Sequence, residues 1–258
     1  MLAKATDAVE AIIELQDITV EFAGFVAIGG LDLNVREGEL RCLIGPNGAG
    51  KTTALDVICG KVKPASGRVV FGGREITRLE EHEIARHGVG RKFQVPSVFR
   101  ELTVRQNMEV ALCRAPGVLG NLFRFGNSGA SEQLEKLAEL VGLEETMDLA
   151  AGALSHGQTQ WLEIALLLAQ DARLILMDEP TAGMTAHETT KTAELFNRLK
   201  GRHTLIVVEH DMGFIKEISD IISVMHQGRL LAEGTVAEIE MNSEVRAAYL
   251  GSGGISGA

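Results

Sequence analysis

The sequence predicts an α/β fold: a mostly parallel sheet covered by helices, with an antiparallel β subdomain at one edge and an inserted α-helical subdomain. Three observations support this prediction. Short alternating strands come first, apolar residues at helical spacing fill the middle, and strands alternate with helices after residue 171, which is typical of a parallel sheet. We expect one unit over residues 1–258. Residues 1–86 and 172–258 would form the core with its β subdomain, and residues 87–171 the helical subdomain.

The N-terminal segment predicts the antiparallel sheet. Apolar residues alternate roughly over residues 12–35, and Gly29-Gly30 interrupts the pattern, so we expect a strand, a turn at these glycines and a second strand. Residues 69–71, followed by two glycines, predict a hairpin strand that joins this sheet with residues 75–76. Phe22 lies 29 positions before Lys51, so its ring either packs in the core or stacks on an adenine at the site described next.

A glycine-rich turn separates an apolar strand at residues 40–44 from a helix with an apolar face at residues 54–58. Glycines let successive backbone N–H groups point at phosphate oxygens, and the positive end of the helix dipole favours the same anions. Lys51 is then expected on the outer phosphates of a nucleoside triphosphate and the Thr52 hydroxyl on a magnesium ion. The alternative is a glycine turn that opens an ordinary helix. The residues expected to bind the nucleotide are Gly45, Pro46, Asn47, Gly48, Ala49, Gly50, Lys51, Thr52 and Thr53.

The sequence in the middle of the chain predicts a second helix N-terminus that can bind an anion. Ser155 is expected to be the N-cap of a helix over residues 159–170, with Gly157 in the first turn. Such a terminus binds anions, and one nucleotide has no use for two of them, so this one is expected to serve a nucleotide held by another subunit. Before it we expect a strand at residues 88–93, a surface loop or broken helix at 115–131, and a helix at 132–143 that a glycine ends.

The C-terminal part predicts two acids at a strand end. The buried strand at residues 173–177 is followed by Asp178 and Glu179, and strand ends in such sheets line the crevice where ligands bind. Asp178 is expected to hold magnesium opposite Thr52, or alternatively to cap a helix. Glu179 is expected to accept a proton from, or orient, the attacking water. The other expected elements are helices at residues 185–200 and 212–219 and strands at 203–208, 221–225 and 229–233.

The composition argues against a nucleic-acid partner. Asp and Glu total 35 against 25 Lys and Arg, which gives a net charge of -10, whereas binding a phosphate backbone needs a basic surface. Cys42, Cys59 and Cys113 are far apart among apolar neighbours, as expected of buried thiols in a reducing cytoplasm. No stretch has the length and apolar character of a secretory signal or a membrane span, so any role at a membrane is expected to depend on partners.

Four motifs in order resemble the ATP-binding subunit of an ABC transporter. They are the phosphate loop, Leu-Ser-His-Gly-Gln at residues 154–158 in place of the usual Leu-Ser-Gly-Gly-Gln signature, the strand ending in Asp178-Glu179, and His210 at the end of the next strand. The resemblance covers residues 12–250. It implies a P-loop NTPase core of the RecA type, ATP and Mg²⁺ as ligands, and a head-to-tail dimer with a second ABC ATPase subunit, identical or related. Each ATP would lie between the phosphate loop of one subunit and the signature of the other, Ser155, His156, Gly157 and Gln158.

The resemblance also assigns further roles. Gln94 matches the glutamine that reaches magnesium and the attacking water and reports to the membrane domain, and His210 matches the histidine that contacts the outer phosphate. Without the resemblance, Gln94 would be interpreted as a surface amide and His210 as a histidine whose hydrogen bonds are made within the protein. Two positions depart from the family: His156 replaces a glycine, and Thr185 stands where many relatives have an aspartate.

A finer resemblance, in residues 90–94, 154–163 and 182–185, is to the urea-importer ATP-binding subunit within the branched-chain amino acid and amide importer group. It implies that ATP hydrolysis powers uptake of urea or a related amide. Permease subunits would carry the solute, a periplasmic or extracellular binding protein would deliver it, and this subunit would sit peripherally on the cytoplasmic face of the inner membrane. The alternatives are the ATPase of a branched-chain amino acid importer, a soluble ABC ATPase without a transport role, and a nucleotide-binding regulator without turnover.

Overall fold

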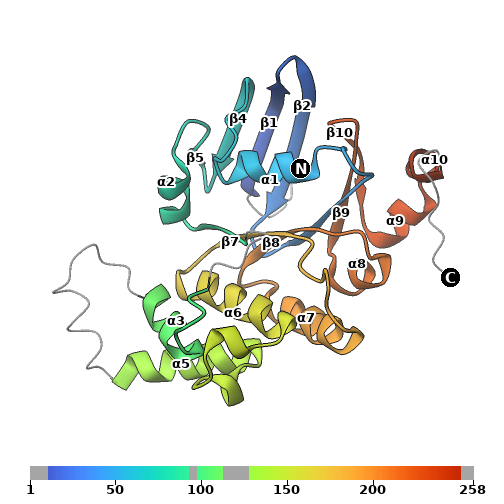
Figure 1. The fold of residues 1–258 in the computed structure, drawn as a ribbon. Helices are drawn as coiled ribbons and strands as arrows, with labels where there is room; N and C mark the ends of the chain where they lie inside the picture. Colours follow the sequence, from blue (N-terminus) through green and yellow to red (C-terminus); the bar gives the residue numbers. More distant parts are fainter. Residues whose placement is uncertain (1–10, 93–97, 113–127, 251–258) are drawn as a thin grey trace, which may run out of the picture.

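The computed structural model describes residues 11–92, 98–112 and 128–250 and contains two sheets. The first is antiparallel, with the strand order β2-β1-β4-β5, and the second has the order β10-β9-β3-β8-β7-β6. The predicted α/β fold with an antiparallel edge is therefore confirmed (Figure 1). The antiparallel sheet comprises β1 (Ala11–Phe22), β2 (Phe25–Arg36), β4 (Ser66–Phe71) and β5 (Arg74–Glu75). The second comprises β3 (Leu40–Ile44), β6 (Val89–Arg91), β7 (Leu174–Asp178), β8 (Thr204–Val208), β9 (Ile221–His226) and β10 (Arg229–Gly234).

The turn between β1 and β2 lies at Ala23-Gly24, so the prediction of a turn at Gly29-Gly30 was wrong. Both turn residues have positive φ, 48° and 86°, as a tight hairpin requires. Gly30 instead forms a β-bulge inside β2, because Ile18 pairs with Leu31 whereas Thr19 pairs with Gly29. Its φ of 71° explains why a glycine stands within the strand.

Strand β3 lies in the middle of the second sheet, parallel to β8 on one side and to β9 on the other. Strands β7 and β6 continue the parallel order, and β10 closes the sheet antiparallel to β9. All five residues of β3 and of β8 are buried, which is typical of strands covered on both faces. The carboxyl ends of β3 and β7 point to the same edge, so their following loops meet there.

Each face of the second sheet belongs to a different apolar core, because successive side chains of a strand point to opposite faces. Leu43 packs with the antiparallel sheet and α1, whereas its neighbours Cys42 and Ile44 pack with α6, α7 and α8. Figure 1 shows the antiparallel sheet with α1 on one side of β7 and β8, and α6 to α8 on the other. The helices are α1 (Lys51–Ile58), α2 (Glu81–Arg86), α3 (Val104–Leu112), α5 (Ser128–Val141), α6 (His156–Ala169), α7 (Ala186–Leu199), α8 (Met212–Ile218), α9 (Val236–Met241) and α10 (Ser243–Leu250).

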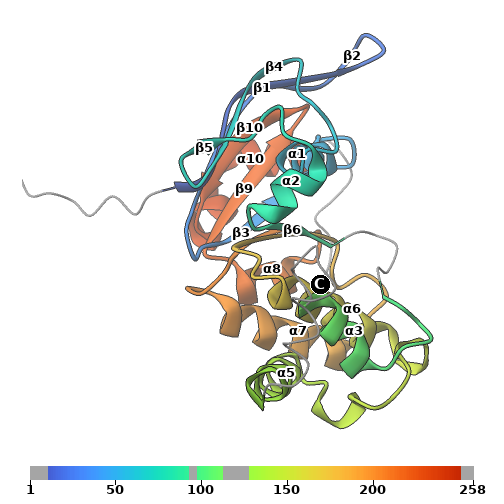
Figure 2. The ribbon, with the colours of Figure 1, turned by 90° about the vertical axis from the view of Figure 1, so that its left-hand side faces the viewer.

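The inserted helices α3, α5 and α6 pack on one another at the end of the molecule away from the antiparallel sheet (Figure 2). α5 begins at Ser128, so residues 128–131 of the segment expected to be a surface loop or broken helix are helical, and the helix expected from residue 132 begins four residues earlier; residues 115–127 lie outside the described part. Gly142, with a φ of 71°, follows the end of α5 as predicted. Because β6 pairs with β7, residues 89–91 continue the parallel sheet just past the subdomain boundary expected at residue 87.

Cys42 and Cys59 are buried and free, as predicted, and Cys113 lies outside the described residues. In the ranges that the structure describes, no helix combines the length and apolar character needed to cross a bilayer. α9 and α10, which follow the last strand, were not predicted from the sequence.

Candidate functional site

The glycine-rich turn runs from the end of β3 at Ile44 to the start of α1 at Lys51. Two of its glycines lie against other backbone segments. At Gly45, with φ of 151°, an added Cβ would lie 2.2 Å from the carbonyl oxygen of Met225, and at Gly50, with φ of 99°, it would lie 2.9 Å from that of Ala27. Glycine is required at both positions, because a side chain would collide with the backbone of β9 or β2. The close approach of these two strands holds the turn in place.

The N-terminus of α1 is open to an anion. Its N-cap, Gly50, has no side chain to accept the first N–H groups, and its first turn contains no acid. In contrast, Ser155 caps α6, Thr185 caps α7 and Asp211 caps α8 through side-chain oxygens. Uncapped N–H groups and the positive end of the helix dipole make the start of α1 an anion-binding site.

Lys51 places a cation beside this terminus. Its Nζ donates hydrogen bonds to the carbonyl oxygens of Gly45 at 2.7 Å and Pro46 at 3.1 Å. Burial lowers the pKa of Lys51, while the nearby carboxylates of Asp178 and Glu179 act in the opposite direction. The ammonium group therefore lies over the turn, within reach of an anion bound there.

Thr52 and Asp178 bring the two halves of the predicted metal site together. The Thr52 Oγ1 donates a hydrogen bond to Asp178 Oδ2 at 2.9 Å, across the gap between α1 and the end of β7. A hydroxyl and a carboxylate are hard oxygen donors of the kind that Mg²⁺ prefers, and Mg²⁺ is usually bound by one or two such groups together with phosphate oxygens. The donor set fits Mg²⁺. Among the described residues, no group of three or more His, Cys, Asp and Glu side chains is arranged to hold a metal.

Glu179 adopts a left-handed backbone conformation, with a φ of 48°. Its N–H donates to the Val208 carbonyl oxygen at 2.9 Å, which fixes it to the end of β8, and its side chain is half exposed. His210 Nδ1 lies 3.7 Å from Glu179 Oε1. A non-glycine residue at positive φ costs free energy and persists where the surroundings impose it, often at functional sites. The conformation turns the carboxylate out of the strand, toward His210.

Glu209 is a site residue to which the sequence reasoning gave no role. Its side chain is buried, and it accepts hydrogen bonds from Thr181 N at 3.1 Å, Thr181 Oγ1 at 2.6 Å and His210 N at 3.0 Å. It therefore ties the segment after Glu179 to the segment that carries His210. The signal was available, because Glu209 follows the buried strand β8 just as Glu179 follows β7.

The predicted capping role of Ser155 is confirmed, although α6 begins at His156, three residues before the expected start. The Ser155 Oγ accepts from Gln158 N at 3.2 Å, and the Gln158 Oε1 accepts from Ser155 N at 2.9 Å. Further contacts join this terminus to α7 and the loop before it: Ser155 Oγ donates to Glu188 Oε1 at 2.8 Å, and His156 Nε2 lies 3.0 Å from the Ala182 carbonyl oxygen. Within this chain, the start of α6 therefore contacts α7 and the loop before α7 through these side chains.

Phe22 and Gln94 have different outcomes. Phe22 lies at the tip of the β1–β2 hairpin with 48% of its surface exposed, so the core alternative was wrong and stacking on adenine stays a prediction. Gln94 lies outside the described residues. Two residues earlier, Lys92 is buried, and burial lowers its pKa while Glu163, Asp178 and Glu209 act in the opposite direction. Lys92, the residue after β6, therefore lies within the electrostatic influence of Asp178 and Glu209.

Family models and curated relatives match most of this chain. A family model described as ABC transporter matches residues 28–182, and one described as branched-chain amino acid ATP-binding cassette transporter matches residues 229–255. The chain is 39% identical to the high-affinity branched-chain amino acid transport ATP-binding protein BraF of Pseudomonas aeruginosa, covering 93% of this chain and 98% of the relative. It is 35% identical to LivG of Escherichia coli (strain K12), with 94% and 98% covered.

Solved structures of ATP-binding cassettes are also similar to this chain. The ADP conformation of MJ1267, an ATP-binding cassette of an ABC transporter, has a TM-score of 0.81 and 31% identity, covering 93% of this chain and 99% of that one. A dimeric post-hydrolysis state of the cassette MJ0796, bound to ADP and Pi, has a TM-score of 0.72 and 25% identity over 87% of this chain and 98% of that one.

Proposed function

The chain belongs to the ABC transporter family, as an ATP-binding subunit of the branched-chain amino acid transporter group, and on this premise we propose that its ATP hydrolysis drives import of branched-chain amino acids. Members of this family are ATPases that power transport, and this subunit is one of them. The urea reading receives no support from the relatives, whose names specify branched-chain amino acid transport. The alternative reading, an importer of branched-chain amino acids, is therefore preferred.

The observation that carries the catalytic part of the proposal is the open N-terminus of α1 with Lys51, Thr52 and Asp178 beside it. Residues 45–53 would cradle the phosphates of ATP with their backbone N–H groups, and Lys51 would move from the carbonyl oxygens of the turn onto the outer phosphates. Phe22, exposed at the hairpin tip, would stack on the adenine ring.

Thr52 and Asp178 would hold Mg²⁺, joined by Gln94, and the bound ion would neutralise charge on the phosphate oxygens. Glu179 would accept the proton of the attacking water. The water oxygen then forms a bond to the outer phosphorus, the bond from that phosphorus to the oxygen of ADP breaks, and ADP and phosphate leave. His210, held by Glu209, would donate a hydrogen bond to the outer phosphate.

A second cassette would complete the site. Ser155, His156, Gly157 and Gln158 would contact the ATP that the phosphate loop of the partner subunit holds, in a head-to-tail homodimer or heterodimer. Ser155 supports this because it places a hydroxyl at the N-terminus of α6, a helix terminus separate from the one that residues 45–51 form at α1. A related cassette has been solved as a dimer bound to ADP and Pi.

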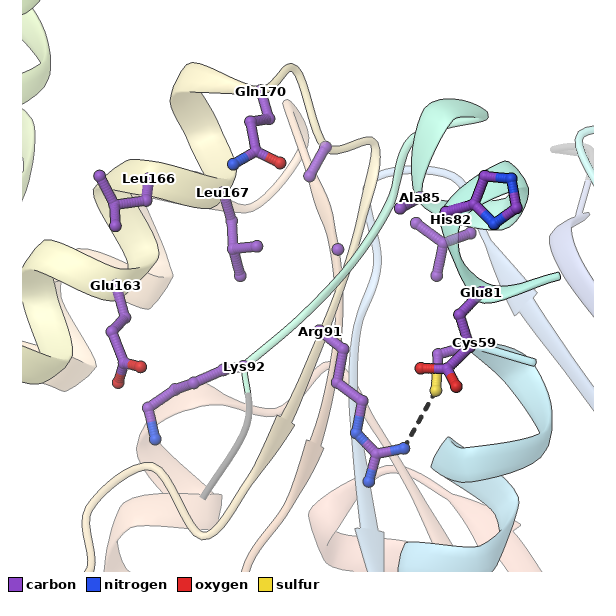
Figure 3. A pocket seen from close by; sticks show the side chains of 13 residues that line it. Cys59, Glu81, His82, Ala85, Arg91, Lys92, Glu163, Leu166, Leu167 and Gln170 are labelled. Carbon is purple, nitrogen blue, oxygen red and sulfur yellow. Dashed lines mark hydrogen bonds between the residues drawn. The ribbon is translucent and has the colours of Figure 1, made fainter. Parts of the chain in front are cut away.

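A permease subunit would dock at the cavities between α2, β6 and α6. One cavity, of about 430 Å³, is lined by Arg91, Lys92 and Glu163 among others, and Figure 3 shows α6 and α2 on its opposite sides. A neighbouring cavity of about 550 Å³ is lined by the half-exposed Phe99 and Val110, and the two share Ala85, Leu166 and Gln170. We propose that a helix of the permease occupies this groove, because an apolar helix face fits a groove of this kind. Lys92, which lines the groove, lies two positions before Gln94 in the sequence.

The proposed assembly places this subunit peripherally on the cytoplasmic face of the inner membrane, with permease subunits and a periplasmic or extracellular solute-binding protein. The test is to reconstitute the co-purified permease complex in liposomes with ATP and to measure uptake of radiolabelled leucine and of urea through the cognate binding protein. Leucine uptake that needs ATP is expected. Uptake of urea alone would restore the hypothesis of urea import. An active ATPase with which no permease subunit co-purifies would overturn the transport role.

A further inference from the structure

The N-terminus of α6 is already occupied by an anion from its own chain, the carboxylate of Glu188. Glu188 Oε1 accepts the hydroxyl proton of Ser155 at 2.8 Å, and the backbone N–H of Gly157 also donates to this carboxylate. The other oxygen, Oε2, accepts from Thr185 N and Thr185 Oγ1, both at 2.9 Å. One carboxylate therefore joins the start of α6 to the start of α7.

Gly157 and the Glu188 side chain lie close together. An added Cβ at Gly157 would lie 2.5 Å from Glu188 Oε1 and 2.8 Å from Glu188 Cγ. Both distances are shorter than real Cβ contacts, so any larger residue would push Glu188 away. The absence of a side chain at Gly157 is thus explained within this chain by the approach of Glu188.

The carboxylate of Glu188 is charged at neutral pH. Hydrogen bonds from the Thr185 backbone, the Ser155 hydroxyl, the Thr185 hydroxyl and the Gly157 backbone lower its pKa to about 2. A full negative charge therefore lies at the place where the proposed function puts the outer phosphate of the ATP held by the partner subunit.

We propose that Glu188 is a positioning residue that holds the Ser155 hydroxyl and the Gly157 N–H within its own chain, and that the phosphate of the partner's ATP must displace it. The inference rests on the proposed two-subunit site. A hydroxyl has one proton, so Ser155 cannot donate to Glu188 and to a phosphate at once, and two anions at one helix terminus repel each other. Glu188 thereby raises the ATP concentration needed to close the two cassettes.

Displacement of Glu188 would also affect the loop that follows Glu179, the proposed general base. Its second oxygen holds Thr185, at the end of the loop that begins beside Glu179, and Thr181 at the start of that loop is held by Glu209. His156 Nε2 contacts Ala182 within the same loop. A shift of Glu188 on arrival of the partner's ATP would release one of the restraints on the loop that follows Glu179.

The test measures the ATP dependence of hydrolysis by the assembled transporter, with its permease and partner cassette, carrying Glu188→Gln in every copy of this chain. Removing the charge weakens the hold on Ser155 and removes the repulsion, so we expect the half-saturating ATP concentration to fall by roughly three- to tenfold. The affinity for ADP, which lacks the outer phosphate, should stay unchanged. Glu238→Gln is the matched control. Glu238 has the same position in α9 as Glu188 has in α7 and accepts from Thr235 N and Oγ1 at 2.8 Å each, without reaching α6.

Glu188→Ala and Glu238→Ala give a second matched pair, in which only Glu188→Ala frees the Ser155 hydroxyl from its carboxylate partner. Both should lower the thermal midpoint by similar amounts, but only Glu188→Ala should lower the half-saturating ATP concentration. A half-saturating concentration that rises, or that changes no more than in the Glu238 variants, would reduce Glu188 to an ordinary helix cap and overturn the inference. Ser155→Ala separates this from failure of the two-subunit site: full activity of Ser155→Ala would overturn the proposed site itself, whereas loss of activity would leave the Glu188 result decisive.

Discussion

The Oγ1 of Thr52 donates a 2.9 Å hydrogen bond to the Oδ2 of Asp178, although 126 residues separate them in the chain. The contact exists because β3, which leads into α1, and β7, which ends in Asp178, are parallel strands of one sheet separated only by β8. The oxygen atoms of a hydroxyl and a carboxylate therefore meet at one edge, where a divalent cation bound to phosphate would be held.

Asp178→Asn should raise the Mg²⁺ concentration needed for half-maximal ATP hydrolysis by about 10- to 100-fold, the usual cost of altering a metal's surroundings. The amide keeps the shape of the side chain but lacks the negative charge that attracts the ion. The measurement is a Mg²⁺ titration of the hydrolysis rate. Asp148→Asn, at an exposed residue that pairs with Arg105, is the control and should leave the titration unchanged. Equal Mg²⁺ dependence in both variants would exclude Asp178 as a ligand.

Glu179→Gln should slow hydrolysis by roughly 10² to 10⁴, the usual contribution of a positioned general base, while ATP still binds. Single-turnover hydrolysis and an ATP-binding titration measure the two effects separately. The exposed Glu194 on α7 provides the control, Glu194→Gln, which should behave like the wild type. Unchanged turnover in Glu179→Gln would remove Glu179 from the proposed mechanism.

Lys51→Ala should weaken nucleotide binding itself by about 10- to 100-fold, because a hydrogen bond to a charged phosphate is worth about 1.5–3 kcal/mol. Titration with a fluorescent ATP analogue measures this affinity. Lys61→Ala removes an exposed lysine whose partner is Asp56, outside the turn, and should leave the affinity as it is. A Lys51→Ala protein that binds ATP normally would show that the ammonium group is not a phosphate ligand.

Glu209→Ala should lower the free energy of unfolding by about 1–3 kcal/mol, because it leaves the donors of Thr181 and His210 without their buried acceptor. Urea denaturation measures the loss, and hydrolysis should fall with it since the segments beside Glu179 and His210 are no longer tied together. Glu209→Gln keeps an accepting oxygen and should recover much of both. Equal stability of Glu209→Ala and wild type would show that the three hydrogen bonds contribute nothing net.

Cys42 should resist alkylation in the folded protein at pH 8. Burial, and secondarily the charge of Glu209, raises the pKa of its thiol to about 12. Since the thiol of an unfolded chain ionises near pH 8.5, the stabilisation associated with the neutral thiol is fully present below that pH and is lost as pH rises toward 12. Mass spectrometry after iodoacetamide treatment, with and without urea, checks the first point. Cys42→Ala should flatten the alkaline fall in unfolding free energy, and an unaltered fall would assign it to other groups.

The sequence allowed prediction of most of the fold because local patterns and tertiary packing agree there. The strands over residues 40–44, 174–177 and 204–208 are short, mostly apolar runs that are buried on both faces, and the cap at Ser155 follows from local hydrogen-bond chemistry. The turn at Ala23-Gly24 was missed because Gly29-Gly30 is the stronger turn signal locally. The structure uses Gly30 for a bulge, which only the pairing with β1 makes visible.

The site was predicted only as far as its residues act through sequence motifs. Lys51, Thr52, Asp178 and Glu179 belong to such motifs. Glu209 and Glu188 act instead by joining segments that are far apart in the chain, through Thr181, His210 and Ser155. A glutamate three residues after a threonine predicts a capping box, but nothing in that local pattern indicates that a second helix would donate to the same carboxylate.

The position of β3 between β8 and β9 has a consequence for synthesis on the ribosome. Both strands that pair with it are translated after residue 203, so β3 and the glycine-rich turn after it emerge long before either strand can pair with β3. Until then, an apolar segment with unpaired backbone groups is exposed in the nascent polypeptide, a state prone to aggregation. Chains released before residue 204 are therefore expected to be substrates for chaperones and proteases and to lack affinity for nucleotides.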